Sequence, residues 1–429
     1  MATTRAHARP FLVLLAAAVA IATAVKLYIS FSFEGTIDVV YWQQFLGLIR
    51  RFGSGVYRSH ELFNHPPFMI HVLRAAGALA DASGLSLAFW LRFPGILADA
   101  GSVVLVWLIA RRSLPDLDRS VLLLLLALAP ASILISGYHG NTDPIMVCML
   151  LLAVYAMEAG SPWAAGLAFG MAMSFKVVPV IFVPAFVAYR RTIRGALAFG
   201  VTAGATFVAT GMPYVLDDPA FLAQRIFGYA GGSAAWWGLP LLVRLTDEHM
   251  RSQAIYSETW RAAPGMRELY SLISTASAAY ARWGTATVLG SIAVLSLWLN
   301  RRERRPALFV QCGIVALVFL FFMPSFGPQY LAWVIPWAVA AGPLAAILFY
   351  EASGALLGWL YVTHLQPNVL TIPLSLACWA SIGVAGLVLW QRAQAAMRAP
   401  DAARSRWTRR VARAALAGLA TLAIAVGVL

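Results

Sequence analysis

The sequence predicts an all-α fold: a polytopic transmembrane helix bundle of about 12–13 spans. Hydrophobic residues make up 61% of the 429 residues and charged residues only 12%, too little polar surface to cover a soluble globule of this size. Apolar runs close to the roughly twenty residues that cross a bilayer recur along the chain. The cations cluster on short segments between these runs.

The spans are expected to begin near Phe11, Phe89, Ser120, Pro144, Trp163, Val177, Gly195, Ala281, Pro306, Pro328, Ser353, Val369 and Val411. The opening stretch resembles a signal peptide, but Lys26 and the long array of downstream spans favour a retained first helix. Cys148, Cys312 and Cys378 fall within apolar runs, so we expect them to be core residues.

The arginines predict the topology. A net charge of +14 would suggest nucleic acid in a soluble protein, but here the positive-inside rule explains it, and we expect no nucleic-acid partner. With a cytoplasmic N-terminus, nineteen of the 32 Lys and Arg residues lie on short cytoplasmic segments and a compact tail. We therefore expect a multi-pass protein of the inner or plasma membrane, in contact with its lipids, whose active site faces the periplasm or exterior.

The domain organisation is a single transmembrane domain, residues 1–429, with two long outer loops, residues 32–88 and 213–280, and a basic cytoplasmic segment, residues 391–410, before a last span. Loops of that length usually carry function. Six of the seven histidines map to the outer face. The apolar spacing between Val39 and Arg51 predicts a helix lying in the membrane interface.

The first outer loop holds the candidate carboxylates. Asp38 falls at the N-terminal end of the expected interfacial helix, where it is either a helix cap or a site carboxylate. Glu34 is either a second site carboxylate or a solvated loop residue. Asn64 and His65 precede a Pro pair that starts another helix. His60 and His65 lack a third ligand at zinc spacing, so we expect no cofactor, although a divalent metal is left open.

Two further segments carry polar groups at the membrane surface. His139, Asn141 and Asp143 occupy the short loop between the third and fourth spans, either as plain turn residues or as site residues. Lys176, one of two lysines in the chain, lies between short apolar runs that suit a broken helix holding an anionic headgroup. The alternative is a structural ion pair between Lys176 and Asp99, and an Asp99 pair with Lys26 is equally conceivable.

Aromatic and amide groups complete the candidates. Trp236 and Trp237 in the second long loop are either membrane anchors or a stacking platform for sugars, and Asp247, Glu248 and His249 follow them. Gln329 and Tyr330 enter the tenth span from outside, where they offer hydrogen bonds.

In order along the chain, the motifs are Glu34 and Asp38, Asn64 to Pro67, Arg92 to Asp99, Tyr138 to Asp143, Phe175-Lys176, Trp237-Gly238 and Gln329 to Trp333. Together they resemble the polytopic GT-C glycosyltransferases that take sugar from a polyprenyl-phosphate carrier. The resemblance covers roughly residues 11 to 390. It looks closest to bacterial mannosyltransferases of the phosphatidylinositol-mannoside type and to the eukaryotic mannosyl- and glucosyltransferases that act on lipid-linked glycans.

The resemblance implies transfer of a hexose, with mannose favoured, to a lipid- or glycan-linked acceptor hydroxyl with inversion. Carried over, Asp38 is the catalytic base, with Glu34 as its alternative. The substrate-binding set is Asn64, His65, His139, Asn141, Asp143, Lys176, Trp237, Gln329 and Tyr330. The first loop lacks the DxD triplet seen in metal-dependent members. A secondary transporter or lipid flippase stays as the alternative function, although no inverted repeat is visible.

Overall fold

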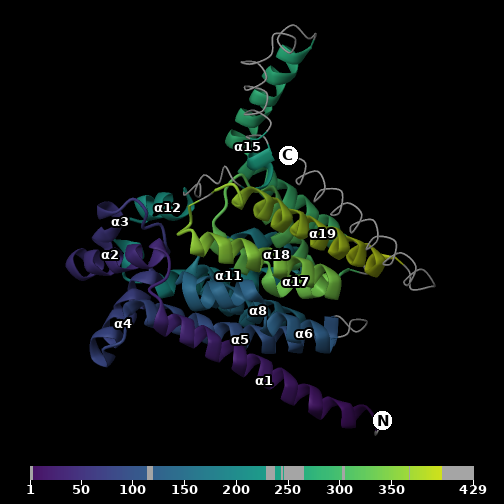
Figure 1. Ribbon diagram of the computed structural model, residues 1–429, viewed down its shortest axis with the longest axis horizontal. Coiled ribbons are helices and arrows are strands. Elements are labelled where there is room, and N and C mark those ends of the chain that lie inside the picture. The colour runs from purple at the N-terminus through teal and green to yellow at the C-terminus, as the bar shows by residue number, and fades with distance from the viewer. Residues whose placement is uncertain are drawn as a thin grey trace.

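The computed structural model describes residues 3–113, 119–228, 237–242, 245, 265–301, 305–366 and 368–398. Throughout these ranges the chain is an all-α helix bundle, as the apolar runs predict (Figure 1). The predicted last span near Val411, the basic segment beyond residue 398, and Trp236 with Asp247 to His249 lie outside the described residues.

The N-terminal half supplies the first long helix and the elements around the first outer loop. In order, these are α1 (Thr3–Ser32), α2 (Ile37–Phe52), a 3-10 turn η1 (Gly53–Gly55), α3 (Val56–Ser59), α4 (Phe68–Ser83), α5 (Leu87–Ser113), α6 (Arg119–Ala127), α7 (Pro130–Leu134), a π-helical turn η2 (Ile135–His139), α8 (Asp143–Glu158), α9 (Pro162–Phe175), η3 (Val178–Phe182), α10 (Val183–Arg190) and α11 (Ile193–Gly211).

The C-terminal half completes the bundle. Its described elements are η4 (Tyr214–Leu216), α12 (Pro219–Phe227), α15 (Met266–Asn300), α16 (Leu308–Phe322), η5 (Pro328–Trp333), α17 (Ile335–Ala341), α18 (Pro343–Val362) and α19 (Thr371–Met397). Because α15 begins at Met266, the end of the predicted 213–280 loop is helical. Figure 1 shows this helix projecting from the bundle.

Seven helical segments of the described chain are long and apolar enough to cross a bilayer, one of them, Ser120–His139, made up of α6, α7 and η2. The chain is therefore a multi-pass membrane protein. The remaining predicted span positions in the described chain hold shorter or broken helices. The sixteen residues of α8 rise about 24 Å, less than the roughly 30 Å of a bilayer core. These short elements surround the candidate site, where the chain leaves regular helix to turn polar groups inward.

Small residues let α9 and α11 approach closely. A β-carbon on Gly166 would come within 2.5 Å of the Phe199 carbonyl oxygen, and one on Gly170 within 2.5 Å of the Ala203 carbonyl oxygen. This spacing of four residues is the one that permits close helix contact in membranes. The contact fixes α9, whose C-terminal end carries Lys176.

A buried ion pair joins α1 to α5. The Lys26 ammonium donates to Asp99 at 2.5 Å and to the Ser132 hydroxyl at 2.9 Å, and Ser136 also donates to Asp99. The suggested pair between Asp99 and Lys176 is therefore wrong, because Asp99 faces Lys26 instead. Lys26 is 3% exposed, so α1 belongs to the packed bundle.

The elements of the first outer loop gather at one end of the bundle, where Figure 1 shows α2, α3, α4 and α12 together. The predicted apolar stripe of α2 is present, and Trp42, Phe45, Leu46 and Ile49 are all buried. Protein covers this stripe, since α2 packs on α4 and Phe45 contacts Phe63 at a ring distance of 5.0 Å. The loop is thus a folded cap over the bundle.

The three cysteines are free and buried, which confirms the prediction that they are core residues.

Candidate active site

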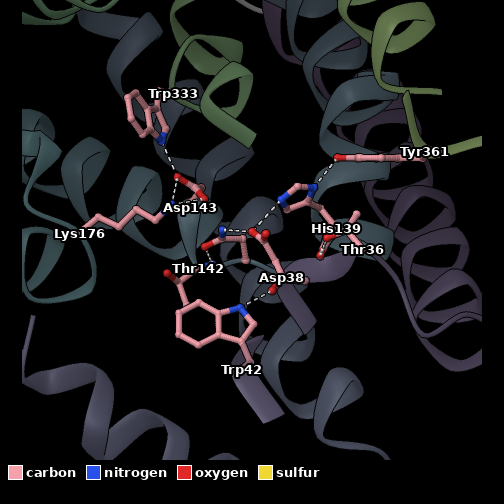
Figure 2. Close-up of polar contacts among 11 residues, drawn as sticks. Thr36, Asp38, Trp42, His139, Thr142, Asp143, Lys176, Trp333 and Tyr361 are labelled. Atoms are coloured by element: carbon pink, nitrogen blue, oxygen red, sulfur yellow. Dashed lines mark hydrogen bonds and ion pairs between the residues drawn. The ribbon is translucent and has the colours of Figure 1, made fainter. Parts of the chain in front are cut away.

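The start of α2 is held against the loop that joins η2 to α8. Thr36 donates from its hydroxyl to the His139 carbonyl at 2.9 Å, and the Trp42 indole donates to the Gly140 carbonyl at 2.9 Å. Between these two anchors lies Asp38, in the first turn of the helix. Figure 2 shows the three side chains pointing toward the loop. The position of Asp38 is therefore fixed from both sides.

A buried arginine shapes the link between α1 and α2. Arg92 is 1% exposed, and its guanidinium donates to the Phe33 carbonyl at 2.8 Å and to the Glu34 carbonyl. Gly35 follows with a φ of +104°, a conformation that suits glycine. A β-carbon at Gly35 would lie 2.4 Å from the Tyr138 carbonyl oxygen. The tight turn before α2 thus depends on this arginine and this glycine.

Two side chains of the loop bind the Asp38 carboxylate. Asn141 donates from its amide to Oδ2 of Asp38 at 2.9 Å, and His139 Nε2 lies 3.1 Å from the same oxygen. The N-cap of α2 is Thr36, whose side chain makes no capping bond, so the interpretation of Asp38 as a helix cap is wrong. The carboxylate instead faces the loop, because two strong donors there outweigh a local backbone bond.

The surroundings of Asp38 favour its charged form. Burial acts to raise its pKa, but the electrostatic interactions with His139 and Lys176 and the hydrogen bonds from His139 and Asn141 outweigh that effect. The pKa consequently falls from its ordinary 3.8 to about 2. Asp38 is therefore ionised at neutral pH, the state that a base requires.

Lys176 is held at the mouth of a break between helices. It follows the last residue of α9 in an extended conformation, before η3 begins at Val178. Its ammonium donates to both oxygens of Asp143, at 2.9 and 2.8 Å, and the Trp333 indole donates to Asp143 at 2.5 Å (Figure 2). Asp143 is fully buried, whereas the Lys176 side chain is 12% exposed. The carboxylate thus anchors an ammonium that still reaches open space.

That space is a cavity of about 420 Å³. Asp38 and Asn141 line it on one side and Lys176 on another, with Asn64, His65, Gln329 and Tyr330 around them. Its remaining wall is largely apolar and comes from segments far apart in the sequence: Val177, Val178, Val180, Ile181, Ile226, Phe227, Leu289, Phe319, Leu320 and Met323. One cavity therefore combines a carboxylate, an ammonium and a long apolar surface.

The aromatic wall beside Asp38 includes His65. The His65 and Trp42 rings lie 4.5 Å apart, and the Tyr57 hydroxyl donates to the His65 carbonyl at 2.7 Å. Burial, and after it the charge of Lys176, lower the pKa of His65 from 6.5 to about 3 against the opposing effect of Asp38. His65 is therefore neutral at physiological pH.

The structure separates the other candidates by position. His139 and Asp143 are buried directly behind Asp38 and Lys176. Glu34 is exposed and outside the cavity lining. Trp237 is 1% exposed and stacks on Phe326 at a ring distance of 3.8 Å, so it packs inside the protein and does not line this cavity.

Three residues in these contacts were absent from the predicted site. Trp333 stood in a segment singled out in the sequence, but its bond to Asp143 could not be read from spacing. Arg92 was part of a noted run, without an assigned role. Tyr361 gave no signal, because it is one aromatic residue near the end of an apolar helix; its hydroxyl lies 3.0 Å from His139 Nδ1.

Comparison with known families gives the class of protein. Residues 66–324 match the model of Glycosyltransferase family 87, which is more than half of the chain. The chain belongs to glycosyltransferase family 87. Among curated proteins, none matches it. The predicted assignment to a membrane glycosyltransferase family is thereby confirmed. The match favours an enzyme over the alternative of a transporter or flippase.

Only part of the candidate site of this family 87 glycosyltransferase lies within the matched segment. His139, Asn141, Asp143 and Lys176 fall inside residues 66–324. Asp38 comes before the match, and the segment from Gln329 onward comes after it. The fold brings all three parts to one cavity.

Proposed function

We propose that this enzyme transfers a hexose from a polyprenyl-phosphate carrier to a hydroxyl of a lipid- or glycan-linked acceptor, with inversion, on the outer face of the membrane. Mannose is the hexose that the GT-C resemblance favours. The single observation that carries the proposal is the cavity in which Asp38 and Lys176 meet beside an apolar wall. A polyprenyl-phosphate sugar has the matching parts: an apolar chain, an anionic phosphate and a sugar.

The ammonium of Lys176 suits the phosphate. It is the cation of the cavity lining in the described chain. Asp143 holds it from behind and itself accepts from the Trp333 indole. As the bond between the sugar and the phosphate breaks, negative charge grows on the phosphate oxygen, and a fixed cation stabilises it. The adjoining apolar wall from η3, α12 and α16 suits the first isoprene units.

The Asp38 carboxylate suits the acceptor hydroxyl. Both of its hydrogen bonds in the described chain end on Oδ2, which leaves Oδ1 for the incoming proton. The acceptor oxygen gives its proton to Asp38 and bonds to the anomeric carbon, while the bonding pair to the carrier leaves on the phosphate. The products are the new glycoside and the carrier phosphate.

One carboxylate is consistent with inversion. Among the described residues that line the cavity, Asp38 is the carboxylate, and Asp143 is buried behind Lys176. Retention through a covalent intermediate would need a second carboxylate at the anomeric carbon as nucleophile. A single displacement with Asp38 as base therefore fits the site.

The test is transfer by purified protein in lipid vesicles. Radiolabelled polyprenyl-phosphate mannose, with glucose and galactose analogues beside it, is supplied together with a lipid extract of the producing cells as acceptor. We expect label in an extracted glycolipid or glycan. Asp38→Asn should lose about 10²- to 10⁴-fold in rate with donor binding intact, whereas the exposed Glu34→Gln should change little. Transfer only from nucleotide sugars would refute the donor class, and full activity of Asp38→Asn would refute the base.

A further inference from the structure

A buried histidine stands between the Asp38 carboxylate and a tyrosine from a distant helix. His139 is 1% exposed; its Nε2 lies 3.1 Å from Asp38 Oδ2, and its Nδ1 lies 3.0 Å from the Tyr361 hydroxyl oxygen. Figure 2 shows the three groups in a line from α2 to α18. Both nitrogens of the imidazole are therefore occupied by protein.

The two partners determine where the imidazole carries its hydrogen. An ionised carboxylate can only accept, so the nitrogen that faces Asp38 must donate. A neutral imidazole has a single N–H, which leaves Nδ1 as an acceptor for the Tyr361 hydroxyl. The opposite tautomer would set the Nε2 lone pair against Asp38 Oδ2.

Tyr361 has no direct access to substrate. It is 6% exposed, its ring packs 5.0 Å from the Tyr138 ring, and it is absent from the cavity lining. Any contribution to the reaction must pass through His139.

We propose that Tyr361 is a positioning residue, whose hydroxyl donates to Nδ1 of His139, supports the Nε2–H tautomer that faces Asp38, and thereby holds Asp38 oriented for proton transfer. This inference rests on the proposed role of Asp38 as base. With Oδ2 held by His139 and Asn141, Oδ1 stays aimed at the cavity through the catalytic cycle. Second partners of this kind typically contribute about 10- to 100-fold to the function of the group they orient.

The histidine and tyrosine pair lies among charged and titratable side chains. Titratable and charged groups lie around the pair on every side: Asp38 from α2, Arg92 from α5, Tyr138 from η2, Asp143 from α8, Lys176 after α9, and Tyr361 from α18. Without the tyrosine hydroxyl, Nδ1 loses its partner, and within the described chain only the bond to Asp38 still orients the imidazole.

The experiment compares Tyr361→Phe with Tyr350→Phe in the reconstituted transfer assay. Tyr350 lies on the same helix, is equally buried, and donates to the Ile335 carbonyl at 2.8 Å, away from the cavity. We expect Tyr361→Phe to lower kcat at neutral pH about tenfold, with KM for the donor unchanged. Tyr350→Phe should keep the wild-type kcat.

A double-variant cycle covers the case in which Tyr361→Phe is poorly folded. His139→Gln places an amide donor toward Asp38 that needs no tautomer, so adding Tyr361→Phe to it should cost little further rate. Losses that simply multiply would overturn the proposal. If Asp38→Asn is inactive while Tyr361→Phe behaves as Tyr350→Phe, only this inference fails; if Asp38→Asn is active, the proposed base fails with it.

Discussion

Removing the Lys176 ammonium tests the proposed donor site. Because Lys176 pairs with the buried Asp143, the test must also change Asp143. In Lys176→Met, the carboxylate of the fully buried Asp143 keeps the Trp333 indole but loses its cation. An uncompensated buried charge costs about 3–5 kcal/mol of stability. The single variant should therefore express poorly and unfold at lower temperature, whatever Lys176 does for the substrate.

The double variant Lys176→Met/Asp143→Asn separates stability from binding. The asparagine that replaces Asp143 is neutral and can still accept from the Trp333 indole, so we expect most of the stability to return. Donor binding should stay weaker by about 1–3 kcal/mol, the range for one hydrogen bond to a charged group, or roughly 5- to 150-fold in Kd. The assay is equilibrium binding of radiolabelled polyprenyl-phosphate sugar to purified protein, beside thermal unfolding of the same samples.

The other lysine provides the matched control. Lys26 forms the second buried pair, with Asp99 on α5, and lies outside the site cavity. Lys26→Met/Asp99→Asn should bind donor as the wild type does. If the Lys176→Met/Asp143→Asn protein is stable and also binds donor with wild-type affinity, then Lys176 is a structural residue and the phosphate lies elsewhere.

Three further outcomes are expected. Gly35→Ala should abolish folded protein on size-exclusion chromatography, because the β-carbon would meet the Tyr138 carbonyl oxygen at 2.4 Å in a backbone with φ of +104°; a well-folded variant would contradict this turn. His65 has a pKa of about 3 in the native state against 6.5 in the unfolded state. The unfolded state therefore binds more protons below pH 6.5, and the free energy of unfolding decreases as the pH is lowered. His65→Gln should therefore lose less stability than wild type between pH 7 and 5, by up to about 2 kcal/mol in thermal unfolding, and equal losses would refute the shift. Ser59→Cys, in a protein without the three native cysteines, should react with an impermeant maleimide in intact cells; reaction only after lysis would reverse the topology.

The sequence by itself determined the membrane class, the helical architecture and most of the polar groups at the site. Apolar runs are long, local signals, and an ionisable residue within or beside one stands out because burying it is costly. That is why Asp38, the His139 to Asp143 loop and Lys176 could be singled out before their contacts were visible. Their catalytic and binding roles stay predictions.

Only the tertiary structure decided which charge faces which. Spacing cannot distinguish Asp99 from Asp143 as the partner of Lys176, because the choice depends on how α5, α8 and α9 pack. It likewise cannot show that protein covers the apolar stripe of α2, or that Tyr361 reaches a histidine 222 residues away. Contacts between helices distant in sequence are set by close packing of the whole bundle. The sequence of a single apolar helix does not show which helices it packs against.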